Sequence, residues 1–267
     1  MTDRYSRQSF LGVDAERRLA EATIAVVGLG GGGSHIVQQA AHLGFKRFVL
    51  IDHDVVEESN LNRLVSATIA DARGRAPKVV VAERLVRGLQ DDAVVTALQS
   101  RWQDAMDPLV TSDIVFGCVD SFGERDQLER ACRRHLIPLI DIGLDVTVAG
   151  SEPPFLAGQV IVSMPGGPCM WCLGFLNEAV MSAEARKYGD AGARPQVVFG
   201  NGVLASLAVA QAVAMLTDWL GPRPAPVYLE YRGNEMTVRP SARLKFVPPT
   251  CEHFPVSTAG APRFRAV

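Results

Sequence analysis

The chain has 267 residues, of which 48% are hydrophobic and 21% are charged, and its formal net charge is -2. This composition is that of a globular protein long enough to bury one substantial core, and the charge gives no reason to expect nucleic acid or an anionic membrane as a partner. The N-terminal residues lack the apolar segment of a secretory signal, and no uninterrupted apolar stretch reaches the roughly 18 residues of a membrane span, so we expect a cytoplasmic protein.

The first half of the sequence predicts alternating strands and helices. The β-branched run Thr23 to Val27 precedes a glycine run and a helical segment from about Ser34 to Leu43, and a second apolar run ends at Ile51. This βαβ order predicts a parallel sheet with a right-handed crossover. Similar patterns continue the alternation, with a helix after Pro77, strands at 93–98, 113–118 and 138–141, and a helix at 125–135.

The regular alternation ends near residue 145. A shorter strand is expected at 158–163, a long excursion or flap at 173–198, an apolar core helix at 202–220, and a terminal hairpin at 228–238. We therefore predict a Rossmann-like α/β fold with a mixed, mainly parallel sheet, flanking helices and added antiparallel strands. The expected organisation is a single domain over 1–267, with a nucleotide-binding half (1–145), a substrate-binding and flap half (146–250), and a tail (251–267) whose last dozen residues are loosely held.

The glycine run predicts a nucleotide site. Glycines 28, 30 and 33 fit the pattern G-x-G-x-x-G, with Gly31 inside it, and they stand between a predicted strand and a predicted helix. Without side chains, this backbone approaches phosphates at a helix N-terminus, and Asp52 at the end of the next strand accepts hydrogen bonds from a ribose. The pattern does not say which nucleotide binds, and glycines that serve only tight packing are the alternative interpretation.

Polar residues farther along the chain favour ATP. A triphosphate that is cleaved requires cations and a metal ion, whereas a dinucleotide mostly requires backbone amides. Candidates for these roles follow predicted strands of the parallel sheet, where ligand-binding loops lie: Asp54, Asn60, Arg63, Lys78 and Asp120. The glycine motif alone would favour an NAD- or FAD-dependent oxidoreductase. That alternative predicts no role for Arg63, Lys78 or Asp120.

These elements together resemble the MoeB/ThiF/HesA family of adenylyltransferases and the related ubiquitin-activating (E1) enzymes. The resemblance rests on the segments YSRQ, GLGGGGS, LIDHD and SNLNR, on the Pro77-Lys78 pair and on the Asp120 loop, and it runs over most of the chain. It implies ATP and Mg²⁺ as cofactors and a homodimeric enzyme. It also implies the role of each site residue: Asp52 binds ribose, Arg63 and Lys78 contact phosphates, Asp120 holds magnesium, Asp54 and Asn60 support the nucleotide site, and Arg7 reaches the ATP of the partner subunit.

The chemistry of adenylation fits these residue types. A carboxylate that attacks an α-phosphate is already an anionic nucleophile, so it requires charge neutralisation and alignment rather than a general base. Arginine offers a planar fork to phosphate oxygens, lysine a mobile point charge, and magnesium neutralises the leaving pyrophosphate. We therefore assign catalytic roles to Arg7, Arg63, Lys78 and Asp120.

The cysteines predict a structural zinc site in the C-terminal part of the fold. Cys169 and Cys172 form a C-x-x-C pair on a predicted turn, which provides two thiolate ligands. The adenylyltransferase family commonly completes such a site with a second C-x-x-C near the C-terminus, where this chain has Cys251 and His253 instead. These four residues are the expected ligands of a closed, four-coordinate site. A redox pair and a degenerated metal site are the competing interpretations.

The resemblance also implies the substrate. It indicates activation of the C-terminal carboxylate of a ubiquitin-like or sulfur-carrier protein with a Gly-Gly tail, in sulfur transfer or in bacterial ubiquitin-like conjugation. Some relatives carry a nucleophilic cysteine in the flap, but this chain has none between Leu173 and Val198. The reaction therefore stops at the acyl-adenylate, or another protein, such as a conjugating enzyme or sulfur donor, takes part. Adenylation of a peptide or a modified tRNA base, and a non-catalytic docking protein, are the competing functions.

Overall fold

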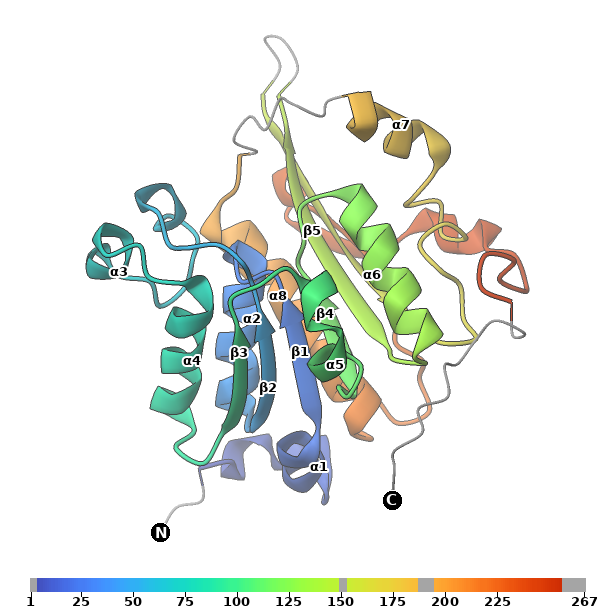
Figure 1. Cartoon of the computed structure of the whole chain (residues 1–267). Helices are drawn as coiled ribbons and strands as arrows, with labels where there is room; N and C mark the ends of the chain where they lie inside the picture. Colours follow the sequence, from blue (N-terminus) through green and yellow to red (C-terminus); the bar gives the residue numbers. More distant parts are fainter. Residues whose placement is uncertain (1–3, 149–152, 187–194, 256–267) are drawn as a thin grey trace.

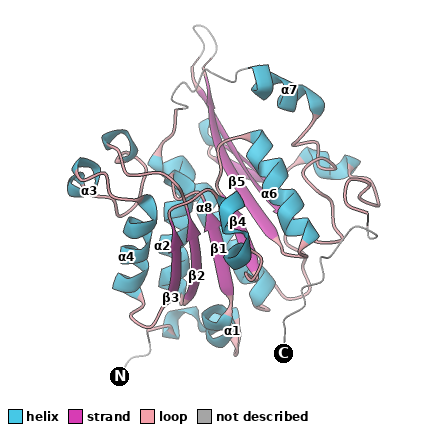
Figure 2. Ribbon diagram, in the orientation of Figure 1, coloured by secondary structure: helices cyan, strands magenta, loops and turns pink. Residues whose placement is uncertain are grey.

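The protein is built on one large mixed sheet (Figures 1 and 2). The computed structural model describes residues 4–148, 153–186 and 195–255, and there the sheet has the strand order β3-β2-β1-β4-β5-β6-β7-β8. The pairs from β3 to β5 are parallel and those from β5 to β8 are antiparallel. The predicted mixed, mainly parallel α/β fold is thus confirmed. The strands are Thr23–Val27 (β1), Arg47–Ile51 (β2), Val94–Leu98 (β3), Ile114–Gly117 (β4), Leu139–Thr147 (β5), Phe155–Ser163 (β6), Tyr228–Arg232 (β7) and Thr237–Pro240 (β8).

Helices cover both faces of the sheet (Figure 1). On one face pack α2 (Gly31–Leu43), α4 (Lys78–Leu89) and α8 (Val198–Leu216), and on the other pack α5 (Met106–Leu109) and α6 (Phe122–Arg134). Helix α7 (Glu178–Arg186) lies beside α6. The remaining helical segments are α1 (Ala15–Glu21), α3 (Ile69–Arg73) and the 3-10 turns Ser6–Leu11 (η1), Glu58–Asn60 (η2), Trp102–Ala105 (η3), Gly233–Glu235 (η4) and Ala242–Phe246 (η5).

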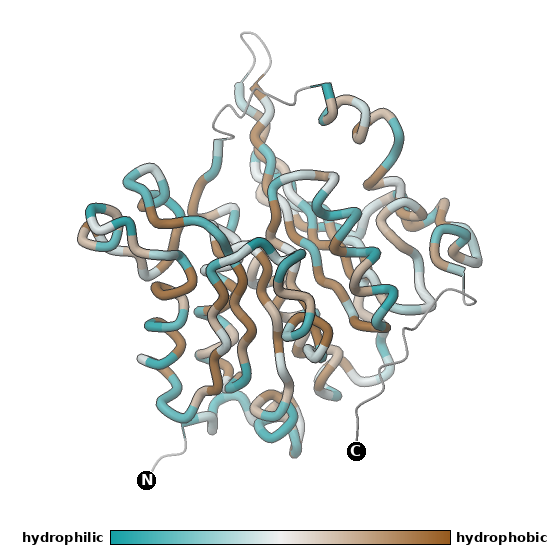
Figure 3. Tube along the Cα trace, in the orientation of Figure 1, coloured by the Kyte–Doolittle hydropathy of each residue, from teal (hydrophilic) through white to brown (hydrophobic). Residues whose placement is uncertain are grey.

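Strand β1 shows why the central strands are continuously apolar. Its side chains alternate, so Ile24 and Val26 belong to the core under α2 and α8 whereas Ala25 and Val27 belong to the core under α6. A parallel strand covered on both faces has no solvent side and therefore needs no polar residues. Figure 3 shows this pattern, with hydrophobic colouring in the strands of the sheet and hydrophilic colouring toward the outside.

Helix α8 is the core helix that the apolar pattern predicts. It contacts α2, β5 and β6, and half of its 18-residue apolar window is buried. Contrary to the expectation from the sequence, α8 is long and apolar enough to cross a bilayer by length and composition, and it is the one helix of the described ranges that is. Core helices of soluble domains pass the same test, and the packing of α8 against the sheet is that of a core helix.

Several element boundaries differ from the prediction. Helices α2 and α6 begin three residues earlier than Ser34 and Arg125, at Gly31 and Phe122, and α8 begins at Val198 instead of Gly202. Strand β5 continues through residue 145, the expected limit between two halves, and joins the parallel and antiparallel parts of the sheet. The division into halves stays a prediction. Part of the predicted flap (187–194) and the predicted loose tail (256–267) lie outside the described residues.

Candidate active site and metal centre

A cleft lies at the carboxyl ends of the parallel strands. The chain leaves β1 for β2 on one side and reaches β4 on the other side, so the strand order reverses at β1 and the loops diverge there. Loops after β1 to β4, strand β5 itself and the start of α8 surround the cleft. Its lining includes the predicted site residues Gly28, Gly30, Gly31, Asp52, Asp54, Arg63, Lys78 and Asp120.

The glycine loop packs tightly beneath the cleft. Gly28 has a φ of +87°, and a side chain there would place its Cβ 2.5 Å from the carbonyl oxygen of Cys118. A Cβ on Gly33 would overlap the carbonyl oxygen of Gly28, so this glycine allows the first turn of α2 to pack on the loop. A Cβ on Gly30, by contrast, would meet no atom within 4 Å. Packing thus requires Gly28 and Gly33, whereas Gly30 faces open space at the N-terminus of α2.

Asp52 orders the backbone around the cleft. Its carboxylate is buried and accepts hydrogen bonds from Leu29 N at 2.6 Å and from Asp54 N at 2.8 Å. The first bond ties the glycine loop to the end of β2, the position at which an acidic residue holds a ribose in Rossmann folds.

Lys78 is a nearly buried cation in this cleft. Its Nζ lies 2.7 Å from Asp54 Oδ2 and 4.0 Å from Asp52 Oδ2. Burial is the largest single influence on the pKa of Asp54 and raises it, but the hydrogen bond and positive charge of Lys78, together with the basic groups of His53 and Arg101, more than offset burial, so the pKa of Asp54 lies below its ordinary value. The two groups therefore form an ion pair at the edge of the cleft.

Arg63, Asn60 and Asp120 take different positions. Arg63 is partly exposed in the cleft, where its Nη1 donates to Ser59 O at 2.6 Å. Asp120 lies exposed after β4 and also lines the cleft. Asn60 does not line it; its Oδ1 accepts a hydrogen bond from Glu57 N and closes the 3-10 turn η2 that precedes Arg63. The nucleotide-binding roles of these residues, and that of Gly33, stay predictions.

Arg7 lies far from the cleft of its own chain. It belongs to η1, and the next residue, Gln8, donates to Leu43 O at the C-terminal end of α2. The glycine loop is at the other end of this helix, whose 13 residues span about 20 Å. Arg7 is exposed there, so any contact with ATP requires a second subunit.

The structure adds residues that the sequence did not reveal. Asn201 is a buried polar residue near the start of α8, and a Cβ on Gly31 would overlap its side-chain Nδ2. An asparagine within an apolar helix is the signal that could have identified it. Arg125, on α6, is buried and binds Asp141 and the carbonyl oxygen of Ile142. Other additions to the cleft lining are Ser100, Arg101, Trp102, Glu124 and Gln196.

A groove opens from the cleft along the antiparallel part of the sheet. Gly143 and Leu144 of β5 line both the cleft and the groove. The small residues Gly143 and Ala157 contribute to its floor, and Phe122, Phe175 and Tyr228 provide aromatic walls. The rings of Phe175 and Phe122 are 5.6 Å apart, and those of Phe175 and Tyr228 are 6.5 Å apart. The groove therefore joins an aromatic-walled channel to the nucleotide cleft.

Helix α7 of the predicted flap contacts the N-terminus of α6. The carboxylate of Glu184 accepts hydrogen bonds from Phe122 N at 3.0 Å and Gly123 N at 2.9 Å, and Ser121 Oγ accepts one from Glu124 N at 3.0 Å. An anionic cap is stabilising at a helix N-terminus, where free amide groups carry partial positive charge. Helix α7 is thus held against the start of α6, immediately after the Asp120 loop.

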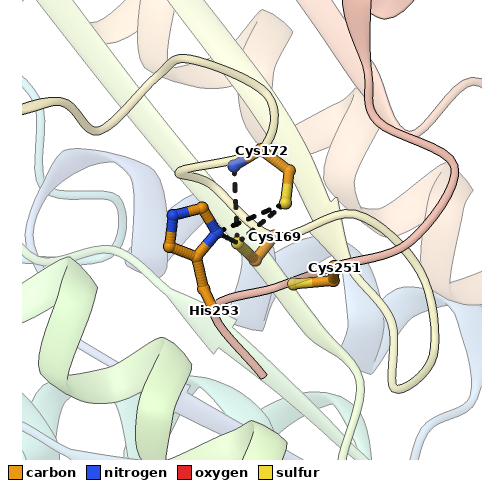
Figure 4. A group of neighbouring side chains, drawn as sticks. All are labelled: Cys169, Cys172, Cys251 and His253. Atoms are coloured by element: carbon orange, nitrogen blue, oxygen red, sulfur yellow. Dashed lines mark hydrogen bonds between the residues drawn. The ribbon is translucent and has the colours of Figure 1, made fainter. Parts of the chain in front are cut away.

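The four predicted zinc ligands come together in space (Figure 4). One donor atom each of Cys169, Cys172, Cys251 and His253 lie within 4.8 Å of one another. Nδ1 of His253 is 3.5 Å from Cys169 Sγ and 3.4 Å from Cys172 Sγ, and the two Sγ atoms are 3.5 Å apart. Tetrahedral Zn²⁺ places thiolate and imidazole ligands about 3.5 to 3.8 Å from one another. The donor set and its spacing therefore fit zinc.

Neighbouring contacts hold this cluster in place. Arg133 donates to the carbonyl oxygens of Gly167 and Pro168, and Glu129 accepts from Met170 N, so α6 anchors the turn that carries Cys169 and Cys172. The ring of His253 stacks on Trp171 with centroids 6.0 Å apart. All four ligand positions come from the protein, which is the pattern of a closed structural site.

Comparisons with known proteins agree with this architecture. The SAMP-activating enzyme E1 of Haloferax volcanii is 35% identical over 176 residues, which cover 64% of this chain and 61% of that protein. The molybdopterin-synthase adenylyltransferase of Salmonella typhimurium is 29% identical over 85% of this chain and 86% of its own length. The sulfur carrier protein ThiS adenylyltransferase of Escherichia coli is 29% identical over 80% of this chain and 81% of its own length.

Solved structures show the same fold, and a family match covers nearly the whole sequence. The Escherichia coli MccB structure with AMPCPP and MccA superposes with a TM-score of 0.75 at 20% identity, over 94% of this chain and 74% of that chain. The ThiF family matches residues 3–253. The chain therefore belongs to the ThiF family, the E1-like adenylyltransferases.

Proposed function

We propose that this protein uses ATP to adenylate the C-terminal carboxylate of a ubiquitin-like or sulfur-carrier protein. The observation that carries the proposal is the cleft in which Arg63, Lys78 and Asp120 surround the glycine loop, with a groove leading into it. Because the groove meets the cleft at Gly143, an extended tail lying in it would deliver its terminal carboxylate beside the nucleotide.

The proposed reaction requires no proton transfer. A carboxylate oxygen forms a bond to the α-phosphorus, the bond between that phosphorus and the bridging oxygen to the β-phosphorus breaks, and pyrophosphate leaves with the electron pair. Arg63 and Lys78 stabilise the phosphate charge, and Asp52 binds the ribose. Asp120 would hold magnesium, whose charge would neutralise the leaving pyrophosphate.

A dinucleotide-dependent oxidoreductase fits the cleft less well. Lys78 is buried and paired with Asp54, and it faces the same cleft as Arg63. Keeping a lysine so nearly buried has a desolvation cost, which is explained if a polyanion binds there. The name of the Escherichia coli relative further supports a protein substrate, because that enzyme acts on the sulfur carrier ThiS.

We further propose a structural zinc ion at Cys169, Cys172, Cys251 and His253, and a homodimer in which Arg7 completes the partner's cleft. The zinc proposal rests on the three thiols and one imidazole, whose donor atoms lie within 4.8 Å of one another. The dimer proposal rests on the position of Arg7, which lies at the opposite end of α2 from the glycine loop of its own chain.

Exchange of labelled pyrophosphate into ATP tests the proposed function. We expect exchange when a sulfur carrier such as ThiS, or a SAMP, supplies the true carboxylate, and none when the same carrier lacks its last residue. A small peptide and a modified tRNA run in parallel decide between a protein substrate and these two smaller classes of substrate. Tight NADH binding together with no exchange for any candidate would show that the proposed activity is wrong.

A further inference from the structure

Two hydrogen-bond donors converge over Gly143, where the groove enters the cleft. A Cβ built on this glycine would lie 2.7 Å from Arg125 Nη2 and would overlap Gln159 Nε2. The two nitrogens therefore occupy the space directly above the backbone of β5. Gly143 lines both the groove and the cleft, so this is the point that any tail must pass to reach the nucleotide.

Arg125 is held rigidly with part of its guanidinium uncommitted. Arg125 is only 6% exposed, and its Nη1 donates to Asp141 Oδ1 and to Ile142 O. Its Nη2 donates to no residue in the described part of the chain. The ring of Phe175, a wall of the groove, lies 5.8 Å from the guanidinium carbon. A buried arginine fixed through one nitrogen thus points another N–H toward the junction.

Gln159 provides the second donor from the neighbouring strand. It pairs with Gly143 across the β5–β6 ladder, and it lines the groove. Its carboxamide makes no hydrogen bond within the described ranges, although the side chain is only partly exposed. A carboxamide so placed gains a partner when a ligand with an oxygen acceptor enters the groove.

We propose that Arg125 and Gln159 form a clamp for the terminal carboxylate of the tail, donating to the oxygen that does not attack the α-phosphate. An arginine and an amide N–H offer two convergent donors to an anion and fix its direction, which places the other oxygen toward the nucleotide. The proposal rests on the proposed function, because it assigns the group that the groove delivers. It adds two substrate-binding residues to those in the phosphate part of the cleft.

Binding of paired peptides tests the clamp separately from the chemistry. The probes are one octapeptide ending in Gly-Gly, made as the free acid and as the C-terminal carboxamide, each titrated into the protein saturated with AMPCPP. We expect the unsubstituted protein to bind the free acid about tenfold or more tightly than the carboxamide, because a hydrogen bond to a charged group contributes enough free energy for a difference of that size. Equal or undetectable binding of the two peptides would overturn the clamp.

The variants assign this preference to the two residues. Gln159→Leu and Arg125→Lys should bring the ratio of acid to amide affinity to within about twofold of one, with AMPCPP affinity unchanged. Gln103→Leu, an exposed glutamine on η3, is the matched control and should keep the ratio. If Arg125 had a purely structural role, Arg125→Lys would weaken the binding of both peptides equally and leave the ratio of acid to amide affinity unchanged. That result would contradict the clamp. Pyrophosphate exchange decides the proposed function independently, since it reports the chemistry and not this preference.

Discussion

Lys78 Nζ lies 2.7 Å from Asp54 Oδ2, and this pair connects the start of α4 to the loop after β2. In the proposed reaction the lysine moves its charge toward the phosphates, so Lys78→Met should lower the exchange rate by about 10² to 10³. Asp54→Asn keeps the cation and loses only its partner, and we expect a loss of about tenfold. Exchange rates and ATP affinity measured for both variants check this order. A larger loss for Asp54→Asn than for Lys78→Met would contradict the assignment of Lys78 to the phosphates.

The glycines of the loop should differ sharply in their tolerance of a methyl group. Gly33→Ala forces a Cβ onto the carbonyl oxygen of Gly28, so it should lower the free energy of unfolding by about 1 to 3 kcal/mol or more and weaken ATP binding. Gly30→Ala meets no atom within 4 Å and should leave the unfolding temperature nearly unchanged. Thermal unfolding and ATP titration of the two variants provide the measurement. Equal unfolding temperatures would show that the loop does not pack as described.

Replacing one of the proposed zinc ligands should abolish zinc binding and lower the stability of the protein. Cys251→Ser should abolish stoichiometric zinc in protein purified without chelator and lower the unfolding temperature, because a structural site contributes its binding energy to the folded state. Cys132→Ala is the matched control: this cysteine is buried on α6, outside the cluster, and the variant should retain zinc. Metal analysis and thermal unfolding give the result. Well-folded unsubstituted protein without zinc would refute the site.

Mixing two inactive variants tests whether Arg7 acts across a dimer. Arg7→Ala and Asp120→Ala should each be inactive alone, since each lacks one part of every active site. After subunit exchange, half of the dimers carry one complete site, so about a quarter of the unsubstituted activity should return. Activity that does not return, in a preparation where exchange is verified by mass, would place Arg7 outside the partner's cleft.

The pair of Asp71 and Arg84 should make stability fall in acid. Asp71 accepts hydrogen bonds from Arg84 at 2.8 and 2.7 Å and from Thr68, and the bond from Arg84 is the main cause of a pKa well below the ordinary value. A depressed pKa in the folded state stabilises the protein above the unfolded pKa of about 4, and this contribution is lost as the pH falls through the folded value.

Asp71→Asn should therefore lower the free energy of unfolding at pH 7 and cost progressively less as the pH falls below about 4. Denaturant unfolding of the Asp71→Asn variant and of the unsubstituted protein, at a series of pH values from 7 to below about 4, measures this difference in the free energy of unfolding. Asp92→Asn, which breaks the exposed pair with Lys46, is the control and should have little effect at any pH. A cost for Asp71→Asn that does not shrink in acid would assign its effect to something other than this charge.

The sequence predicted the features that depend on local order along the chain. The glycine run and Asp52 could be located because a strand must end before such a loop, and Cys169 and Cys172 because a C-x-x-C pair on a turn provides two thiolate ligands. Cys251 and His253 followed from the resemblance to the adenylyltransferase family, which commonly completes this site near the C-terminus. Helix α2 was predicted to begin at Ser34 because glycines are poor helix formers, yet it begins at Gly31, because the packing of Gly33 on Gly28 outweighs propensity.

Contacts between distant segments could not be predicted in this way. Glu184 reaches the first turn of α6 from about sixty residues away. Arg125 and Gln159 converge on Gly143 only because α6 packs on β5 beside β6. Nothing in the local pattern of either segment marks the partner. The clamp and the cap of the flap are therefore properties of the assembled sheet and helices.

Strand β5 sets a length as well as a direction. Its residues Gly143 to Val146 line the groove without interruption, and three residues of extended strand cover about 10 Å. An extended tail covers the same distance per residue, so the length of the groove determines how many tail residues a substrate needs to reach the nucleotide. A carrier with two tail residues fewer, docked at the same outer end, would hold its carboxylate about 7 Å short of the nucleotide.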